Sequence, residues 1–141
     1  MEQLFNQLSE KLIDSLNADE HMKISINGEN SQFVRFSQSK VRQSGLVDDA
    51  SLNISLIKDG RTCNGSFTLT GNAEYDEETA ITELMRLRNE VVTLPKDPFV
   101  VLPENTGSSR EDHSGSLLSQ ESTISALSPS MQRVDLAGIW A

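Results

Sequence analysis

The residues best suited to chemistry on this chain are three cations in one segment that lacks acids. The chain has 141 residues and a formal net charge of −9, yet no Asp or Glu lies within 30–47, where Arg35, Lys40 and Arg42 occur. With the neighbouring Gln43, these cations could orient an acidic peptide or protein whose main chain pairs with a strand edge. The alternative is a solvated strand edge, where charged side chains discourage edge-to-edge aggregation.

The other residue types that often carry catalysis are not arranged as a site. Metal ligation needs several ligands that converge at fixed spacing, whereas His21 follows the expected first helix and the other histidine lies in the polar "EDH" at 111–113. Cys63 falls on the apolar side of an alternating run, which is typical of a small buried hydrophobe rather than a reactive thiol. The acidic residues of "YDEET" at 75–79 are explained more simply as charges that stabilise a helix N-terminus than as a catalytic carboxylate pair. We therefore expect no catalytic and no metal-binding residue in this chain.

The composition is that of a globular protein of about one domain. It is 36% hydrophobic and 23% charged. The acidic balance argues against a general nucleic-acid binder, and only Phe33 and Phe36 could stack on bases beside the cations, so a nucleic-acid partner ranks last. The single cysteine, Cys63, allows no internal disulfide and fits a reducing compartment. The N-terminus lacks a signal-peptide pattern, and no apolar run approaches the roughly 20 residues of a membrane helix. We expect a cytoplasmic, soluble chain without a membrane partner.

Hydrophobic periodicity predicts the elements that position these residues. Residues 2–18 repeat leucine every four positions, as an amphipathic helix does. "KISI" at 23–26 is strand-like, Asn27-Gly28 predicts a turn, and "QFVRF" at 32–36 resumes extended character. Residues 50–56 and 62–69 alternate apolar and polar side chains on either side of Asp59-Gly60, which predicts a hairpin with one buried face.

A second helix and a change in composition follow this hairpin. Asp76 is the expected N-cap of an amphipathic helix that continues to about Val91 and is stopped before Pro95. Residues 1–102 therefore form an α+β domain, with an antiparallel sheet of about four strands flanked by the N-terminal helix and a second helix after the sheet. The stretch 103–118 is a Ser/Gly-rich linker. Residues 119–141 are the truncated start of a following region, with a short helix around 124–127 and a final strand in "DLAGIWA".

One run of residues is distinctive. It reads Arg-Phe-x-x-x-x-Val-Arg-Gln-x-Gly, which this chain carries as Arg35, Phe36, Val41, Arg42, Gln43 and Gly45. With the strand pair and the acidic-started helix that follow it, and with the closing "DLAGIWA", this run resembles the N-terminal domain of the TldD/PmbA family. The family has been described as modulators of DNA gyrase and as metallopeptidases. The resemblance covers most of 20–102 and also 135–141, where "DLAGIWA" is similar to a strand that opens the family's next region.

The resemblance implies a function for a longer parent protein. Family members hydrolyse small or unfolded peptides between paired subunits, and the active branch carries a zinc motif, H-E-x-x-x-H, in a later domain. A second branch lacks that motif and is the inactive partner. This chain contains no such motif, so no catalytic or zinc-binding residue is carried over to it. Its implied partners are the C-terminal domain of the same parent, a family member in a homo- or heterodimer, and a peptide substrate.

Three functions remain open from the sequence. The chain is the non-catalytic N-terminal domain of a TldD/PmbA-like peptidase, in which it supports substrate binding or assembly. Alternatively, it is a free-standing module that binds a peptide or protein through Arg35, Lys40, Arg42 and Gln43. The third reading, a gyrase-associated regulator, depends on the older description of the family.

Overall fold

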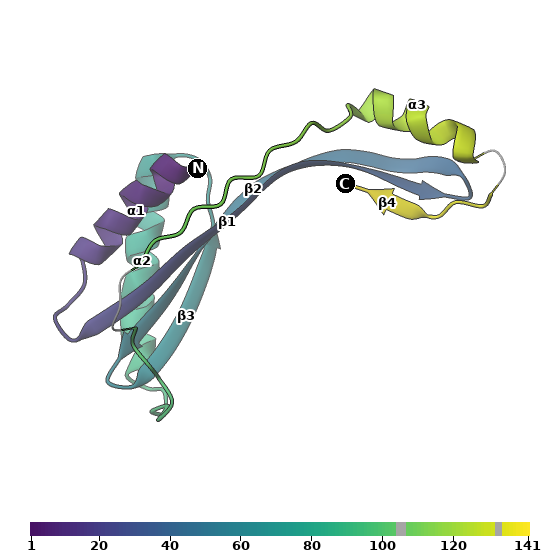
Figure 1. Ribbon diagram of the computed structural model, residues 1–141. Helices are drawn as coiled ribbons and strands as arrows, with labels where there is room; N and C mark the ends of the chain where they lie inside the picture. The colour runs from purple at the N-terminus through teal and green to yellow at the C-terminus, as the bar shows by residue number, and fades with distance from the viewer. Residues whose placement is uncertain (104–106, 132–133) are drawn as a thin grey trace. The chain divides into compact units, whose positions relative to one another are not determined.

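The computed structural model describes residues 1–103, 107–131 and 134–141. In these residues three helices and four strands follow one another along the chain (Figure 1). They are α1 (Glu2–Asp14), β1 (Glu20–Ser37), β2 (Lys40–Lys58), β3 (Arg61–Thr68), α2 (Ala73–Val91), α3 (Gln120–Met131) and β4 (Gly138–Trp140). The strands form one antiparallel sheet in the order β3-β2-β1-β4. This confirms the α+β class with four strands, an N-terminal helix and a helix after the hairpin.

The chain divides into two compact units that share the long strands β1 and β2. Unit 1 comprises Met1–Gly28 and Asp49–Glu104, and unit 2 comprises Glu29–Asp48 and Asn105–Ala141. The first contains α1, α2, β3 and the adjoining parts of β1 and β2. The second contains α3, β4 and the hairpin end of β1 and β2. The domain limits expected from the sequence stay a prediction.

The core of unit 1 lies between its sheet and its two helices. The alternation in β2 buries Leu52, Ile54 and Leu56, which pair across the ladder with Phe67, Gly65 and Cys63 of β3. The helices contribute the apolar stripes that the sequence predicts, and their buried members are Leu8, Leu12, Ala80, Leu84, Leu87 and Val91. Each large aliphatic side chain buried in this way contributes about 1.5–3 kcal/mol of transfer free energy.

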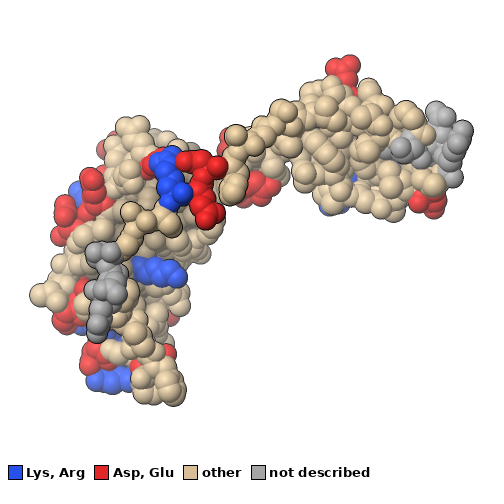
Figure 2. All heavy atoms as spheres, viewed as in Figure 1, with Lys and Arg blue, Asp and Glu red and all other residues tan. Residues whose placement is uncertain are grey.

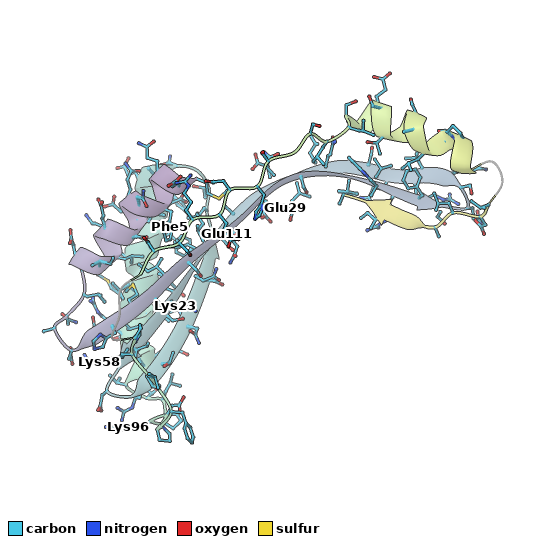
Figure 3. The ribbon with its side chains drawn as sticks, in the orientation of Figure 1. Phe5, Lys23, Glu29, Lys58, Lys96 and Glu111 are labelled. Carbon is cyan, nitrogen blue, oxygen red and sulfur yellow. The ribbon has the colours of Figure 1, made fainter. Side chains whose placement is uncertain are left out.

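The hairpin predicted at Asp59-Gly60 is confirmed. Asp59 and Gly60 have φ of 49° and 68°, which is the left-handed geometry of a type I′ turn, and Lys58 pairs with Arg61 beside it. Asp59 accepts from the Lys96 ammonium at 2.6 Å, and Lys58 and Lys96 lie at this end of unit 1 (Figure 3). The turn is therefore fixed both by its own residue types and by the segment after α2.

The turn predicted at Asn27-Gly28 is wrong, because β1 runs without interruption from Glu20 to Ser37. A Cβ added at Gly28 would lie 2.1 Å from the Met1 methyl group. The glycine thus leaves room for the Met1 side chain instead of making a turn. The chain reverses at Gln38-Ser39, where φ is 51° and 53°. Neighbouring strand pairing outweighs a local turn preference when both flanks can join the ladder.

The start of α2 also differs from the prediction. Asn72 is the N-cap, since its side chain accepts from the Tyr75 amide at 3.2 Å. Asp76 lies inside the helix and is fully buried. Its carboxylate accepts from the Thr70 amide at 2.9 Å, the Thr70 hydroxyl at 2.8 Å and the Gly71 amide at 3.0 Å. Asp76 therefore ties the end of β3 to α2. The first helix likewise ends earlier than expected, at Asp14 rather than residue 18.

Unit 2 combines the hairpin end with two elements from the end of the chain. β4 pairs with β1 in the register Val34↔Trp140, Arg35↔Ile139 and Phe36↔Gly138. Val34 and Phe36 are buried. The expected helix and final strand are thus confirmed as α3 and β4, although α3 continues through Pro129 rather than stopping before it. The described residues of the expected linker, 103 and 107–118, contain neither helix nor strand.

Candidate binding site on the hairpin

The hairpin end is held by the segment that leads into β4. The Ser39 amide donates to the Leu136 carbonyl at 3.0 Å, and the Leu136 amide donates to the Ser39 hydroxyl at 2.9 Å. That hydroxyl in turn donates to the Val134 carbonyl. The turn is therefore attached to residues almost a hundred positions away in the sequence.

Arg35 and Gln43 are brought together by the hairpin. The Arg35 guanidinium donates to the Gln43 side-chain oxygen at 3.3 Å, and both residues are exposed. On its other side Arg35 is the register partner of Ile139, which is 60% exposed. A guanidinium has five N–H donors, so the Gln43 contact leaves most of them directed to solvent or to a ligand.

Arg42 makes a similar contact nearer the turn. Its guanidinium donates to the Gln38 side-chain oxygen at 3.1 Å, and Lys40 beside it is exposed. Within the described residues, Arg35, Lys40 and Arg42 take part in none of the ion pairs. Two of the three cations of the acid-free segment, Arg35 and Arg42, are thus each hydrogen-bonded to a glutamine side chain. Lys40 belongs to the same segment and is exposed.

The apolar residues of the same motif build the support for these cations. Phe36 is 4% exposed and Val34 is fully buried. Gly45 lies under the Phe33 ring, because a Cβ added there would be 2.8 Å from the ring edge. A shallow hollow of about 320 Å³ lies beside Arg35, bounded by Phe36, Gly138 and Ile139. Of the motif residues, Phe36 is therefore buried, whereas Arg35, Arg42 and Gln43 are exposed and Val41 is 42% exposed.

The strand that carries Lys40 and Arg42 has a defined place in the sheet. β2 lies between β3 and β1, and β3 pairs with Ser51–Lys58 of β2. The visible face of unit 2 is mostly uncharged (Figure 2). Exposed Arg and Lys side chains that take part in none of the described ion pairs can orient an acidic peptide or protein.

Sequence reasoning missed several residues of this site. Ile139 comes from β4, and Gln38 and Ser39 form the turn. The sequence offers no signal for Ile139, because its place beside Arg35 depends on pairing between distant segments. The positive φ at Gln38 and Ser39 is equally hidden, because neither residue type favours the left-handed region as glycine does.

The cysteine and the two histidines, all described in the structure, have separate environments. Burial raises the pKa of the Cys63 thiol, and the Glu90 carboxylate raises it further, so the thiol is held protonated. His21 is exposed, and His113 lies 3.7 Å from Glu111 in an exposed stretch. Across residues 1–103, 107–131 and 134–141, no group of three or more His, Cys, Asp or Glu side chains is placed to hold a metal ion.

Three comparisons with known proteins were made for this chain, and none of them gives a match. Neither the protein-family models, nor the curated proteins, nor the solved structures give a match to this chain. Among the helices that the structure describes, none combines the length and the apolar character needed to cross a membrane.

Proposed function

We propose that this chain is the non-catalytic N-terminal part of a TldD/PmbA-like metallopeptidase, in which the hairpin of unit 2 supports substrate binding or subunit assembly. One observation carries the proposal. The two segments that resemble the family most clearly, the Arg35-Phe36 run and the closing "DLAGIWA", lie about a hundred residues apart but are adjacent strands in register. Two separate segments that each resemble the family and that meet in space are what a fold shared with the family would produce.

The chemistry of the hairpin suits a role in binding rather than catalysis. The exposed guanidinium of Arg35 can form paired hydrogen bonds with a carboxylate, and Lys40 and Arg42 can add less directional attraction. In the parent protein, zinc and its ligands would come from a later domain, and a metal-bound water would be the nucleophile. The partners of this proposal are that C-terminal domain, a second family subunit and a peptide substrate.

The first test is the natural gene beyond codon 141. A reading frame that continues and encodes H-E-x-x-x-H supports a part of an active zinc peptidase, and continuation without the motif supports the inactive branch. A stop codon directly after Ala141 would contradict the proposal. The purified chain provides a second test, since zinc-dependent hydrolysis of a fluorogenic peptide that is lost on chelation would contradict a non-catalytic role.

The exposed side chains of Arg35, Lys40 and Arg42 favour a second candidate, a free-standing module for an acidic peptide or protein. Its test is a variant with Arg35→Ser, Lys40→Ser and Arg42→Ser, assayed for capture of an extended acidic peptide. Because all three side chains are exposed and outside ion pairs in the described residues, their loss should abolish capture without lowering thermal stability. Unchanged capture would exclude this module.

A gyrase-associated regulator has the least support, because the acid-free segment 30–47 holds only three cations and the whole chain is strongly acidic. Its DNA-binding form predicts an affinity for duplex DNA that falls steeply as salt increases. Absence of binding at low salt would remove that form.

A further inference from the structure

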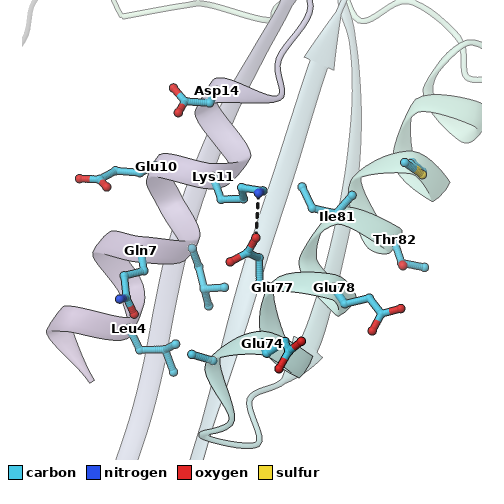
Figure 4. Close-up of a pocket in the computed structure, with 13 residues that line it drawn as sticks. Leu4, Gln7, Glu10, Lys11, Asp14, Glu74, Glu77, Glu78, Ile81 and Thr82 are labelled. Carbon is cyan, nitrogen blue, oxygen red and sulfur yellow. Dashed lines mark ion pairs between the residues drawn. The ribbon is translucent and has the colours of Figure 1, made fainter.

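A groove lies between α1 and α2 in unit 1, with a volume of about 840 Å³ (Figure 4). Its floor is apolar and is built by Leu4 and Leu8 of α1 and by Ile81 and Met85 of α2. Leu8 is almost fully buried, whereas Met85 is 57% exposed. The two helices therefore leave a strip of apolar surface in contact with water.

Both rims of the groove are acidic. The lining carboxylates are Glu10, Asp14, Glu74, Glu77 and Glu78. Lys11 is the only cation among the lining residues, and its ammonium lies 2.8 Å from the Glu77 carboxylate (Figure 4). The hydrogen bond to Glu77 raises the pKa of Lys11, and the charge of Asp14 contributes. Among the described residues, the other four lining carboxylates take part in no ion pair.

Helix stability explains only part of this charge. Acids in the first turns of α2, such as Glu74, favour the positive end of the helix dipole. Glu10 and Asp14 lie in the second half of α1, which ends at Asp14, where a negative charge opposes the dipole. Neither of these two takes part in an ion pair among the described residues. Their placement costs helix stability and gives the groove a strong negative potential.

We propose that this groove binds a cationic amphipathic helix of a partner protein. Two neighbouring helices present a groove into which the ridges of a third helix can pack, and α1, with its 13 residues, offers a length of about 20 Å. The apolar side of the partner helix covers Leu4, Ile81 and Met85, and its Lys or Arg side chains face the acidic rims. This surface uses none of the hairpin residues, so it is independent of the proposed function.

The probe for this proposal is a fluorescein-labelled helical peptide of about 14 residues, which is long enough to cover α1. It carries Leu and Met at helical spacing on one side and Lys elsewhere. Its matched control has Glu in place of every Lys. At about 50 mM salt, where exposed charges interact over more than 10 Å, fluorescence anisotropy should show binding of the Lys peptide and none of the Glu peptide. Absence of binding by the Lys peptide would overturn the proposal.

Two pairs of charge reversals distinguish binding in the groove from non-specific attraction of the Lys peptide to an acidic chain. The double variant Glu74→Lys, Glu78→Lys reverses two charges on the rim of the groove. It should weaken binding of the Lys peptide at least about tenfold, a loss of about 1.4 kcal/mol or more in binding free energy. Asp48→Lys with Asp49→Lys makes the same change of net charge on exposed strand residues, and should weaken binding less than about threefold. Equal weakening by both pairs would show non-specific attraction and overturn the proposal. Far-UV circular dichroism confirms that each variant is folded.

A site-specific signal completes the test. In methyl NMR of the chain, the Met85 methyl should shift on addition of the Lys peptide, whereas the Met22 methyl, packed against the core, should remain in place. Binding that leaves Met85 unchanged would place the peptide elsewhere. A Met85 shift that depends on the concentration of the chain alone would assign the groove to a second copy and would equally overturn the proposal.

Discussion

The buried carboxylate of Glu20 gives the sharpest prediction for stability. Its side chain is 0% exposed, and the Arg88 guanidinium donates to it from Nε at 3.0 Å and from Nη2 at 2.8 Å. The Asn17 amide and side chain each donate at 3.0 Å. Arg88 also donates to the Ser15 carbonyl. This group of contacts joins the loop after α1, the start of β1 and the end of α2.

The pKa of Glu20 shows how strongly these contacts favour its charged form. Burial acts to raise this pKa, but the hydrogen bonds from Arg88 and Asn17 prevail and lower it from 4.5 to about 2. This lowering of the pKa from 4.5 to about 2 corresponds to roughly 3 kcal/mol of stabilisation of the folded state. Because the folded-state pKa is the lower one, this stabilisation is present above pH 4.5 and is lost as the pH falls towards 2.

The perturbation is Glu20→Gln, which removes the charge and keeps the shape. At about pH 7 we expect the free energy of unfolding to fall by about 3 kcal/mol, since the charged Arg88 loses its partner. The measurement is urea unfolding followed by far-UV circular dichroism over a series of pH values. The difference between the wild type and the variant should shrink as the pH falls from 4.5 towards 2.

Asp19→Asn is the matched control. Asp19 is 65% exposed and lies 3.1 Å from the Lys58 ammonium, and an exposed pair of this kind contributes less than about 1 kcal/mol. A Glu20→Gln variant that loses no more than the control at neutral pH would refute the reasoning. A loss that stays constant down to acidic pH would also refute it, because the effect would then come from packing rather than from the charge.

Three further substitutions test the fold in the same assays. Asp76→Ala removes the buried acceptor of three partly buried hydrogen bonds and should cost about 2–4 kcal/mol. Glu78→Ala on the exposed side of α2 should stay within about 0.5 kcal/mol. Similar urea midpoints for the two variants would contradict the bracing role of Asp76. Leu84→Ala leaves a cavity in the core and should lower the free energy of unfolding by about 2–5 kcal/mol. Met85 is exposed, so Met85→Ala should lower it by less than about 1 kcal/mol. An equal loss for the two variants in urea unfolding would contradict the assigned faces of α2. Gly60→Ala puts a side chain at a φ of 68° and should lower the free energy of unfolding by about 1–2 kcal/mol. The melting temperature of this variant should therefore fall. An unchanged melting temperature would contradict the left-handed turn.

The sequence alone predicted the elements whose signal is local. Alternation through Leu52 and Leu56 identified β2 and its buried face, and Asp59-Gly60 fixed the turn and the register of the hairpin. The repeats of leucine identified both helices of unit 1. Each of these signals arises from residues close in the chain, because side-chain period and turn geometry depend on neighbouring positions. The acid-free segment could also be identified from the sequence. Its three cations, Arg35, Lys40 and Arg42, are exposed, as charged side chains usually are.

The tertiary structure decided what depends on distant residues. A turn at Asn27-Gly28 is locally favourable, but β1 continues because both of its flanks pair within the sheet. Asp76 has the residue type of an N-cap, yet the Thr70 and Gly71 donors that surround it are assembled only when β3 meets α2. Arg35 acquires Ile139 as a neighbour only when β4 joins β1. Hydrogen bonds and packing between segments far apart in the chain leave no periodic trace in the sequence, so only the folded chain reveals them.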